Sequence, residues 1–135
     1  MDEKYIRDMC SAYRRAIEED YAGNGLVLYA SKAFACMAIY KIVAAEGIGV
    51  DVVSGGELYT ALKAGFPAEK IYMHGNNKLP SELEMAVDSR VGCIVVDSLT
   101  EIDKLDSLCE RRGVIQRGLI RVNPGVEAHT HHFIQ

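Results

Sequence analysis

The chain lacks the features that mark nucleic-acid-binding, secreted or membrane-spanning proteins. Its 135 residues contain no run of Lys and Arg, and the formal net charge of −4 argues against a surface that follows nucleic-acid phosphates. No apolar run follows the N-terminal Met-Asp-Glu-Lys, so we expect no secretory signal. The apolar block 33–40 is far too short to cross a bilayer. We therefore expect a soluble, cytoplasmic protein that binds neither nucleic acid nor a membrane.

The cysteines also lack a pattern that would indicate disulfides or metal binding. The four of them, Cys10, Cys36, Cys93 and Cys109, are scattered without a Cys-x-x-Cys pair, and three lie inside apolar stretches. This distribution is typical of reduced cysteines that pack as small apolar side chains in a cytosolic protein.

What the sequence does contain is a regular alternation of short apolar runs and helical patterns. With 49% hydrophobic and 25% charged residues, the chain is long enough for one domain with a sizeable core. The apolar runs start roughly 20 to 26 residues apart and are apolar throughout, as expected of parallel strands covered on both faces. The predicted strands lie at 26–30, 49–53, 70–74, 93–97 and 119–122.

Helix signals fill the intervals between these runs. Capping boxes at 54–57 and 98–101 (Ser-x-x-Glu) each predict a helix that begins directly after a strand. Pro80 fits the first turn of a helix, and the segment 33–45, apolar nearly all round, predicts a buried helix. The predicted helix ends lie at Gly47, Gly65 and Gly113.

Two α/β folds fit this alternation. One is a small doubly wound sheet of the flavodoxin type, and the other is about five of the eight units of a TIM (β/α)₈ barrel. The periodicity alone does not choose between them.

One lysine stands where the first predicted strand ends. Lys32 follows the apolar residues 28–30 and precedes a helical pattern. An amine with little solvent around it is more readily neutral, and hence a usable nucleophile toward an aldehyde. The alternative interpretation is a strand-end lysine that reaches out to water.

Four motifs, taken together, resemble the fold-type III pyridoxal-phosphate decarboxylases, and the last two resemble the diaminopimelate branch of that family. They are Tyr-Ala-Ser-Lys-Ala at 29–33, Asp-Val-Val-Ser-Gly-Gly-Glu-Leu at 51–58, His-Gly-Asn-Asn-Lys at 74–78 and Arg-Val-Asn-Pro-Gly-Val-Glu-Ala-His-Thr-His at 121–131. The resemblance extends from about Tyr21 to Gln135 and implies an alanine-racemase-like barrel that binds pyridoxal 5'-phosphate.

The resemblance also implies roles for individual residues. Lys32 matches the lysine that holds the cofactor as a Schiff base. Asp51 matches an aspartate near the cofactor and that lysine, and Arg121 matches a strand-end arginine that lies near the cofactor's phenolic oxygen or holds Asp51. Arg121 as a plain surface charge is the alternative. For His74, the alternatives are a place in the lining of the site and a hydrogen-bonded structural role. For Glu57, the alternatives are a polar group of the site and the glutamate of a capping box.

The resemblance further implies that residues 1–135 form the N-terminal part of the cofactor-binding barrel domain, without three barrel strands and a C-terminal β domain. The intact protein would be a homodimer that converts meso-2,6-diaminopimelate to L-lysine and CO₂. A sibling decarboxylase acting on ornithine, arginine or a polyamine precursor is an alternative, as is a pyridoxal-phosphate-binding barrel without decarboxylase activity.

Three histidines near the end of the sequence raise the question of a metal. His129, His131 and His132 could place imidazoles together, but no Cys or carboxylate stands at ligand spacing. The family motif accounts for two of the three, and we expect no metal site.

Overall fold

In the computed structural model, which describes residues 2–125, strands and helices alternate along the chain. All five strands lie within two residues of the predicted runs. The strands are β1 (Leu28–Ala30), β2 (Gly49–Val52), β3 (Ile71–Met73), β4 (Cys93–Val96) and β5 (Gly118–Ile120). The helices are α1 (Glu3–Asp20), α2 (Met37–Ala45), α3 (Gly55–Lys63), α4 (Pro80–Asp88) and α5 (Leu99–Arg112), with short 3-10 turns η1 (Ser31–Ala33) and η2 (Ala68–Lys70).

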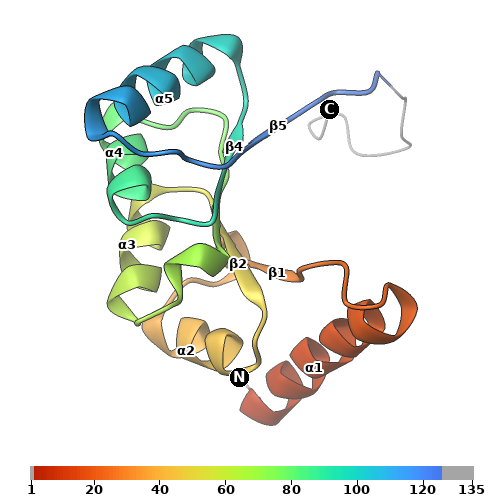
Figure 1. Cartoon of the computed structure of the whole chain (residues 1–135). Coiled ribbons are helices and arrows are strands. Elements are labelled where there is room, and N and C mark those ends of the chain that lie inside the picture. Colours follow the sequence, from red (N-terminus) through yellow and green to blue (C-terminus); the bar gives the residue numbers. More distant parts are fainter. Residues whose placement is uncertain (1, 126–135) are drawn as a thin grey trace.

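The five strands form one parallel sheet whose spatial order, β1-β2-β3-β4-β5, follows the chain. Helices α2 to α5 all cover the same side of this sheet (Figure 1). Helix α1 precedes β1 and contacts α2, where Arg7 pairs with Glu46, and its Cys10 belongs to the buried core. A doubly wound sheet reverses its strand order and carries helices on both faces. The sequential order with helices on one side is that of a (β/α)₈ barrel, so the flavodoxin-type alternative is excluded.

The two faces of the sheet differ in their surroundings. Val50 pairs with Ile71, and Val52 pairs with Met73, and all four are completely buried against the helices. The residues between them face the opposite way, and there Asp51, in register with Tyr72, is only partly buried. A completed barrel would enclose this second face, which the five strands described here leave open.

The predicted helix limits are largely confirmed. Ser54 and Ser98 cap α3 and α5, and the hydroxyl oxygen of each accepts a bond of 3.2 Å from the N–H three residues later. Pro80 is the first residue of α4. The glycines predicted at helix ends have positive φ: 78° at Gly47, 77° at Gly65 and 61° at Gly113.

The prediction for segment 33–45 was partly wrong. Residues 31–33 form the turn η1, and α2 begins only at Met37, whose side chain is exposed. One side of α2 is buried, where Tyr40 packs edge-on against Phe66 with ring centroids 6.2 Å apart. The apolar residues on the other side of α2 remain at the surface, because this helix packs against the core with one side only.

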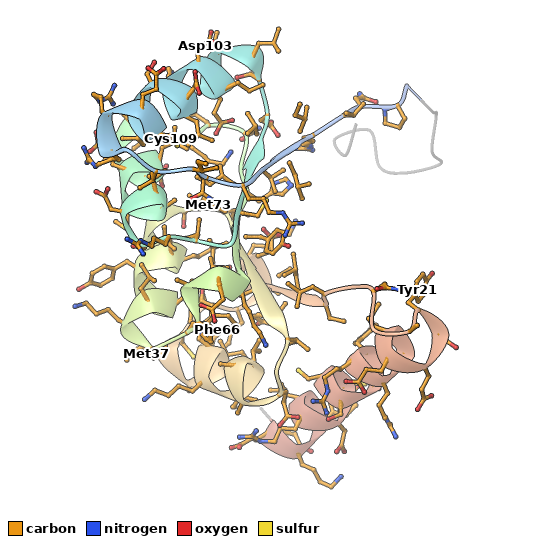
Figure 2. The ribbon with its side chains drawn as sticks, in the orientation of Figure 1. Tyr21, Met37, Phe66, Met73, Asp103 and Cys109 are labelled. Atoms are coloured by element: carbon orange, nitrogen blue, oxygen red, sulfur yellow. The ribbon has the colours of Figure 1, made fainter. Side chains whose placement is uncertain are left out.

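The core lies between the sheet and its helices, and Figure 2 labels two of its residues, Phe66 and Met73. Burying each large apolar side chain in this layer contributes about 1.5–3 kcal/mol. The four cysteines are free thiols, as predicted. Cys10 and Cys93 are buried and the other two are partly buried. Burial raises the pKa of the Cys93 thiol and so lowers its thiolate fraction. None of the helices among residues 2–125 is long and apolar enough to span a membrane.

Candidate active site

The residues of the candidate site follow the carboxyl ends of the strands. Because all five strands are parallel, these ends lie along one edge of the sheet, and that edge carries the active site in (β/α)₈ barrels. The residues there are Lys32 after β1, Val53 and Ser54 after β2, His74 and Gly75 after β3, Asp97 and Ser98 after β4, and Arg121 after β5.

Lys32 is the middle residue of the turn η1, directly after β1. Ser31 before it is buried, whereas Lys32 is exposed, so the expectation of little solvent around the amine is wrong for the part of the chain described. The physical reason is the uncovered inner face of the sheet. Within residues 2–125, the Lys32 amine forms no hydrogen bond or ion pair.

Asp51 lies beside this turn, on the inner face of β2. Its Cα pairs with that of Ala30, the last residue of β1. Its Oδ1 atom is buried and finds no hydrogen-bond partner among the described residues. Burial raises the pKa of the Asp51 carboxyl, the charges of His74 and Lys32 oppose this shift, and Glu57 adds to it. The structure therefore brings Asp51 and Lys32 together, as the resemblance implies, and leaves Oδ1 of Asp51 without a hydrogen-bond partner within residues 2–125.

Glu57 has contacts that the capping-box interpretation missed. In a capping box the glutamate accepts a bond from the N–H of the capping residue itself. Here Glu57 Oε2 instead accepts from the N–H of Val53, at 2.8 Å, and from the hydroxyl of Ser31, at 2.7 Å. The carboxylate thus joins the start of α3 to the turn that carries Lys32.

Glutamates at the same helical position also accept backbone N–H bonds in α4 and α5, where Glu82 forms an ordinary capping box and Glu101 repeats the bond of Glu57. Glu82 of α4 accepts from the N–H of Leu79, at 2.8 Å, and from the N–H of Gly55 in the preceding unit. Glu101 of α5 accepts from the N–H of Asp97, at 2.9 Å. A glutamate at the third position of α3, α4 and α5 was the sequence signal for this series. Its second partners were not predictable from spacing.

The loop after β3 contains His74, Gly75 and Lys78. His74 Nδ1 accepts a bond of 2.9 Å from the N–H of Gly75, whose φ of 114° is a conformation that side chains larger than hydrogen rarely adopt. Lys78 is buried, and its Nζ donates to the carbonyl oxygens of Gly75 and Val95, at 2.7 Å each. The loop is therefore fixed close to β4, with His74 near Asp51.

Arg121 stands at the end of β5, where its N–H donates to the carbonyl oxygen of Val96. Its guanidinium lies 3.3 Å from Asp97 Oδ1 and is more than half exposed. Asp51 is three strands away, about 14 Å along the sheet at the usual strand spacing. Among the described residues, Arg121 therefore pairs with Asp97 and does not hold Asp51, which removes one of the two roles that the resemblance suggested.

The histidines considered as metal ligands in the sequence are not among the residues that the structure describes. Residues 2–125 contain no cluster of three or more His, Cys, Asp or Glu suited to a metal ion. His129, His131 and His132 lie outside the described residues, so the prediction that they bind no metal stays a prediction.

The fold and this edge define a class of protein: a barrel-type parallel sheet with a lysine after the first strand and a carboxylate beside it on the second. Residues 4–135 match the family described as "Pyridoxal-dependent decarboxylase, pyridoxal binding domain". The chain belongs to this family.

Similar proteins with curated names are diaminopimelate decarboxylases. That of Bacillus methanolicus is 49% identical over 133 residues, which cover 98% of this chain and 31% of that protein. That of Bacillus subtilis is 49% identical over 136 residues, covering 98% and 30%. The chain thus spans about a third of the length of the relatives it matches.

Solved structures of diaminopimelate decarboxylases are also similar to this chain. Diaminopimelate decarboxylase from M. jannaschii in complex with L-lysine has a TM-score of 0.82 and 33% identity, covering 94% of this chain and 30% of that one. The Helicobacter pylori enzyme, also complexed with L-lysine, has a TM-score of 0.83 and 30% identity, covering 94% and 32%.

Proposed function

We propose that residues 1–135 are the N-terminal part of the pyridoxal-binding barrel domain of a decarboxylase that converts meso-2,6-diaminopimelate to L-lysine and CO₂. Three observations support this: the barrel-type strand order, the identity of 49% to diaminopimelate decarboxylases, and the coverage of about 31% of such a relative. A fourth observation carries most weight: within residues 2–125, the amine of Lys32 and the neighbouring Oδ1 atom of Asp51 both lack a hydrogen-bond partner.

These two groups fit a cofactor of the pyridoxal 5'-phosphate type. An aldehyde needs a primary amine as its partner, and Lys32 presents one that is exposed and unpaired within residues 2–125. A buried carboxylate oxygen without a partner needs a donor, and the polar groups of such a cofactor can provide it. Arg121, held by Asp97, would contribute a cation at the far end of the same edge.

Each residue has a defined chemical task in this proposal. When bound, the cofactor would act as an electron sink for the carbanion left by loss of CO₂. The ammonium of Lys32 must give up a proton from Nζ before it can act as a nucleophile. Asp51 is suited to accept that proton, because burial raises the pKa of its carboxyl and so makes it a better base.

The substrate follows from the relatives. The M. jannaschii and Helicobacter pylori structures contain L-lysine, which as a product would be released from an amino acid with one more carboxylate. The intact protein would therefore take a small amino acid as its substrate. A cytoplasmic homodimer is the state that we expect for it.

Borohydride labelling tests the assignment of Lys32. The intact protein with bound pyridoxal 5'-phosphate should lose its visible absorption on reduction and carry the pyridoxyl label on Lys32 alone. Lys41, exposed on α2, provides a matched control. Lys41→Ala should label normally and Lys32→Ala should not label at all. A label that maps to another lysine would contradict the proposal.

A product assay with three amino acids tests the substrate. Release of L-lysine from meso-diaminopimelate, with at most weak release of CO₂ from ornithine or arginine, is the expected result. A preference for ornithine or arginine would assign the protein to a sibling activity. Normal labelling of Lys32 with no CO₂ from any of the three would indicate a binding protein.

A further inference from the structure

A buried hydroxyl fixes the turn that carries Lys32. Ser31 precedes Lys32 in η1 and is only 1% exposed. Its Oγ lies 2.7 Å from Glu57 Oε2 and 2.7 Å from the backbone carbonyl oxygen of Asp51. Since a serine hydroxyl has one hydrogen, it donates to one acceptor at a time, and the charged carboxylate is the stronger acceptor.

The other partner in this contact, Glu57, is itself held in place. Its Oε2 accepts from the N–H of Val53, at 2.8 Å, and its own N–H donates to the Ser54 hydroxyl oxygen, at 3.2 Å. The carboxylate therefore cannot shift without disturbing the start of α3. It forms a fixed point against which the neighbouring turn is held.

Lys32, in contrast, has no side-chain partner within residues 2–125 that would orient it. The direction in which its amine points is therefore set by the backbone of η1, and the buried attachment of that backbone is the Ser31 hydroxyl. A nucleophile held in one orientation reacts faster than one that must be ordered during the reaction.

We propose that Ser31 and Glu57 are positioning residues for Lys32, because their hydrogen bond lets the start of α3 fix the turn from which the amine reaches the cofactor. This inference rests on the proposed function, since it takes Lys32 to be the cofactor lysine. Neither residue needs to touch the cofactor in this role.

The structure offers a matched control for a purely structural effect. Glu82 occupies the same position in α4, and its carboxylate accepts two backbone N–H bonds, from Leu79 and Gly55. Glu82→Ala removes a similar pair of bonds, one of them to the first residue of α3, but leaves the Ser31–Glu57 bond in place. A second useful feature is that Glu57 uses one oxygen, Oε2, for both bonds. The amide oxygen of Glu57→Gln can accept both, so this conservative variant should restore the role.

The experiment uses the intact protein, stripped of cofactor and mixed with pyridoxal 5'-phosphate. The rate of covalent attachment is followed by visible absorption and checked by the borohydride label on Lys32, and the melting temperature of each apoprotein is measured in parallel. We expect Ser31→Ala and Glu57→Ala to slow attachment by about tenfold, the scale of one lost bond to a charged group. Glu57→Gln should stay within about threefold of wild type. Glu82→Ala should melt earlier but attach at the wild-type rate.

Three results would overturn the inference. Wild-type rates in both alanine variants would show that the Ser31–Glu57 bond does not matter for attachment. Equal slowing by Glu82→Ala would reduce the effect to general stability. Slowing by Glu57→Gln as large as by Glu57→Ala would assign the effect to charge. A wild-type label on a lysine other than Lys32 is a separate outcome, because it would remove the proposed function and this inference together.

Discussion

Lys78 Nζ and Glu101 Oε1 lie 2.6 Å apart, with 1% of the Lys78 side chain and 10% of the Glu101 side chain exposed. The pair joins the loop after β3 to the first turn of α5, across 23 residues of sequence. Every polar contact that the ammonium needs is present, because the carbonyl oxygens of Gly75 and Val95 accept its other two hydrogens. Buried charges are stable only with such complete pairing.

Removing one partner of this pair should strongly destabilise the fold. Lys78→Met leaves the Glu101 carboxylate buried without its cation, and a change of this kind costs about 3–5 kcal/mol. Urea unfolding of the intact protein measures the loss. The exposed pair Lys4–Asp8 provides the control, since Lys4→Met should cost less than about 1 kcal/mol.

Neutralising both partners should be less harmful than removing one. In the double variant Lys78→Met/Glu101→Gln, the amide oxygen can still accept from the N–H of Asp97, and no charge is left buried. We expect its unfolding free energy to lie above that of Lys78→Met alone. An equal or larger loss in the double variant would show that the charge pairing is not what stabilises this loop.

Asp51→Asn should have opposite effects on activity and stability. It removes a carboxylate that we place beside the cofactor lysine, so the cofactor chemistry should slow by about 100-fold, the lower range for a positioned acid or base. It also removes a partly buried charge without a hydrogen-bond partner, so the melting temperature near neutral pH should rise. An unchanged rate and pH profile would assign Asp51 a structural role.

The pH dependence of this stability effect has a definite sign. The pKa of the Asp51 carboxyl is raised in the folded protein by burial. The unfolded chain therefore ionises first as the pH rises, and the stability that the protonated form contributes is lost as the pH passes the folded pKa. The stability gain of Asp51→Asn over wild type should be smallest near pH 4 and grow toward about pH 7. A gain that shrinks over this range would contradict the proposed burial effect.

Substitutions of Arg121 and of Asp97 should change the Kd of the cofactor to different extents. If Arg121 contacts the cofactor, Arg121→Ala should raise the Kd of pyridoxal 5'-phosphate by about tenfold or more, as for loss of a charge-assisted bond. Asp97→Asn weakens only the exposed ion pair that orients Arg121 and should change the Kd by less than about threefold. Equal effects of the two variants would show that Arg121 acts only through its pairing with Asp97.

Residues 1–135 produced alone should be inactive and should self-associate. The described strands leave β1 and β5 as edges, and Ile120 at the β5 edge is 69% exposed. Exposed strand edges and apolar patches promote association. Light scattering and a lysine-release assay test this, and Ile120→Lys should reduce the association. A monomer that releases lysine would contradict the prediction.

Local chemistry in the sequence determined the elements and their limits. Apolar runs, serine caps, a proline and glycines at helix ends act over a few residues, so the strands were predicted to within two residues and Lys32 was correctly placed after β1. The same signals could not choose between the two α/β folds, because strand order is a relationship between segments distant in the sequence. The sequential order of the strands decided for the barrel.

The contacts around the site were decided by the tertiary structure alone. Ser31 and Glu57 are 26 residues apart, and Lys78 and Glu101 are 23 apart, which is about one strand-helix unit in each case. Parallel pairing of neighbouring strands brings such residues together at one edge, and no local pattern records the distance between them. The exposure of Lys32 has the same origin, because solvent at its amine depends on which strands close the inner face of the sheet.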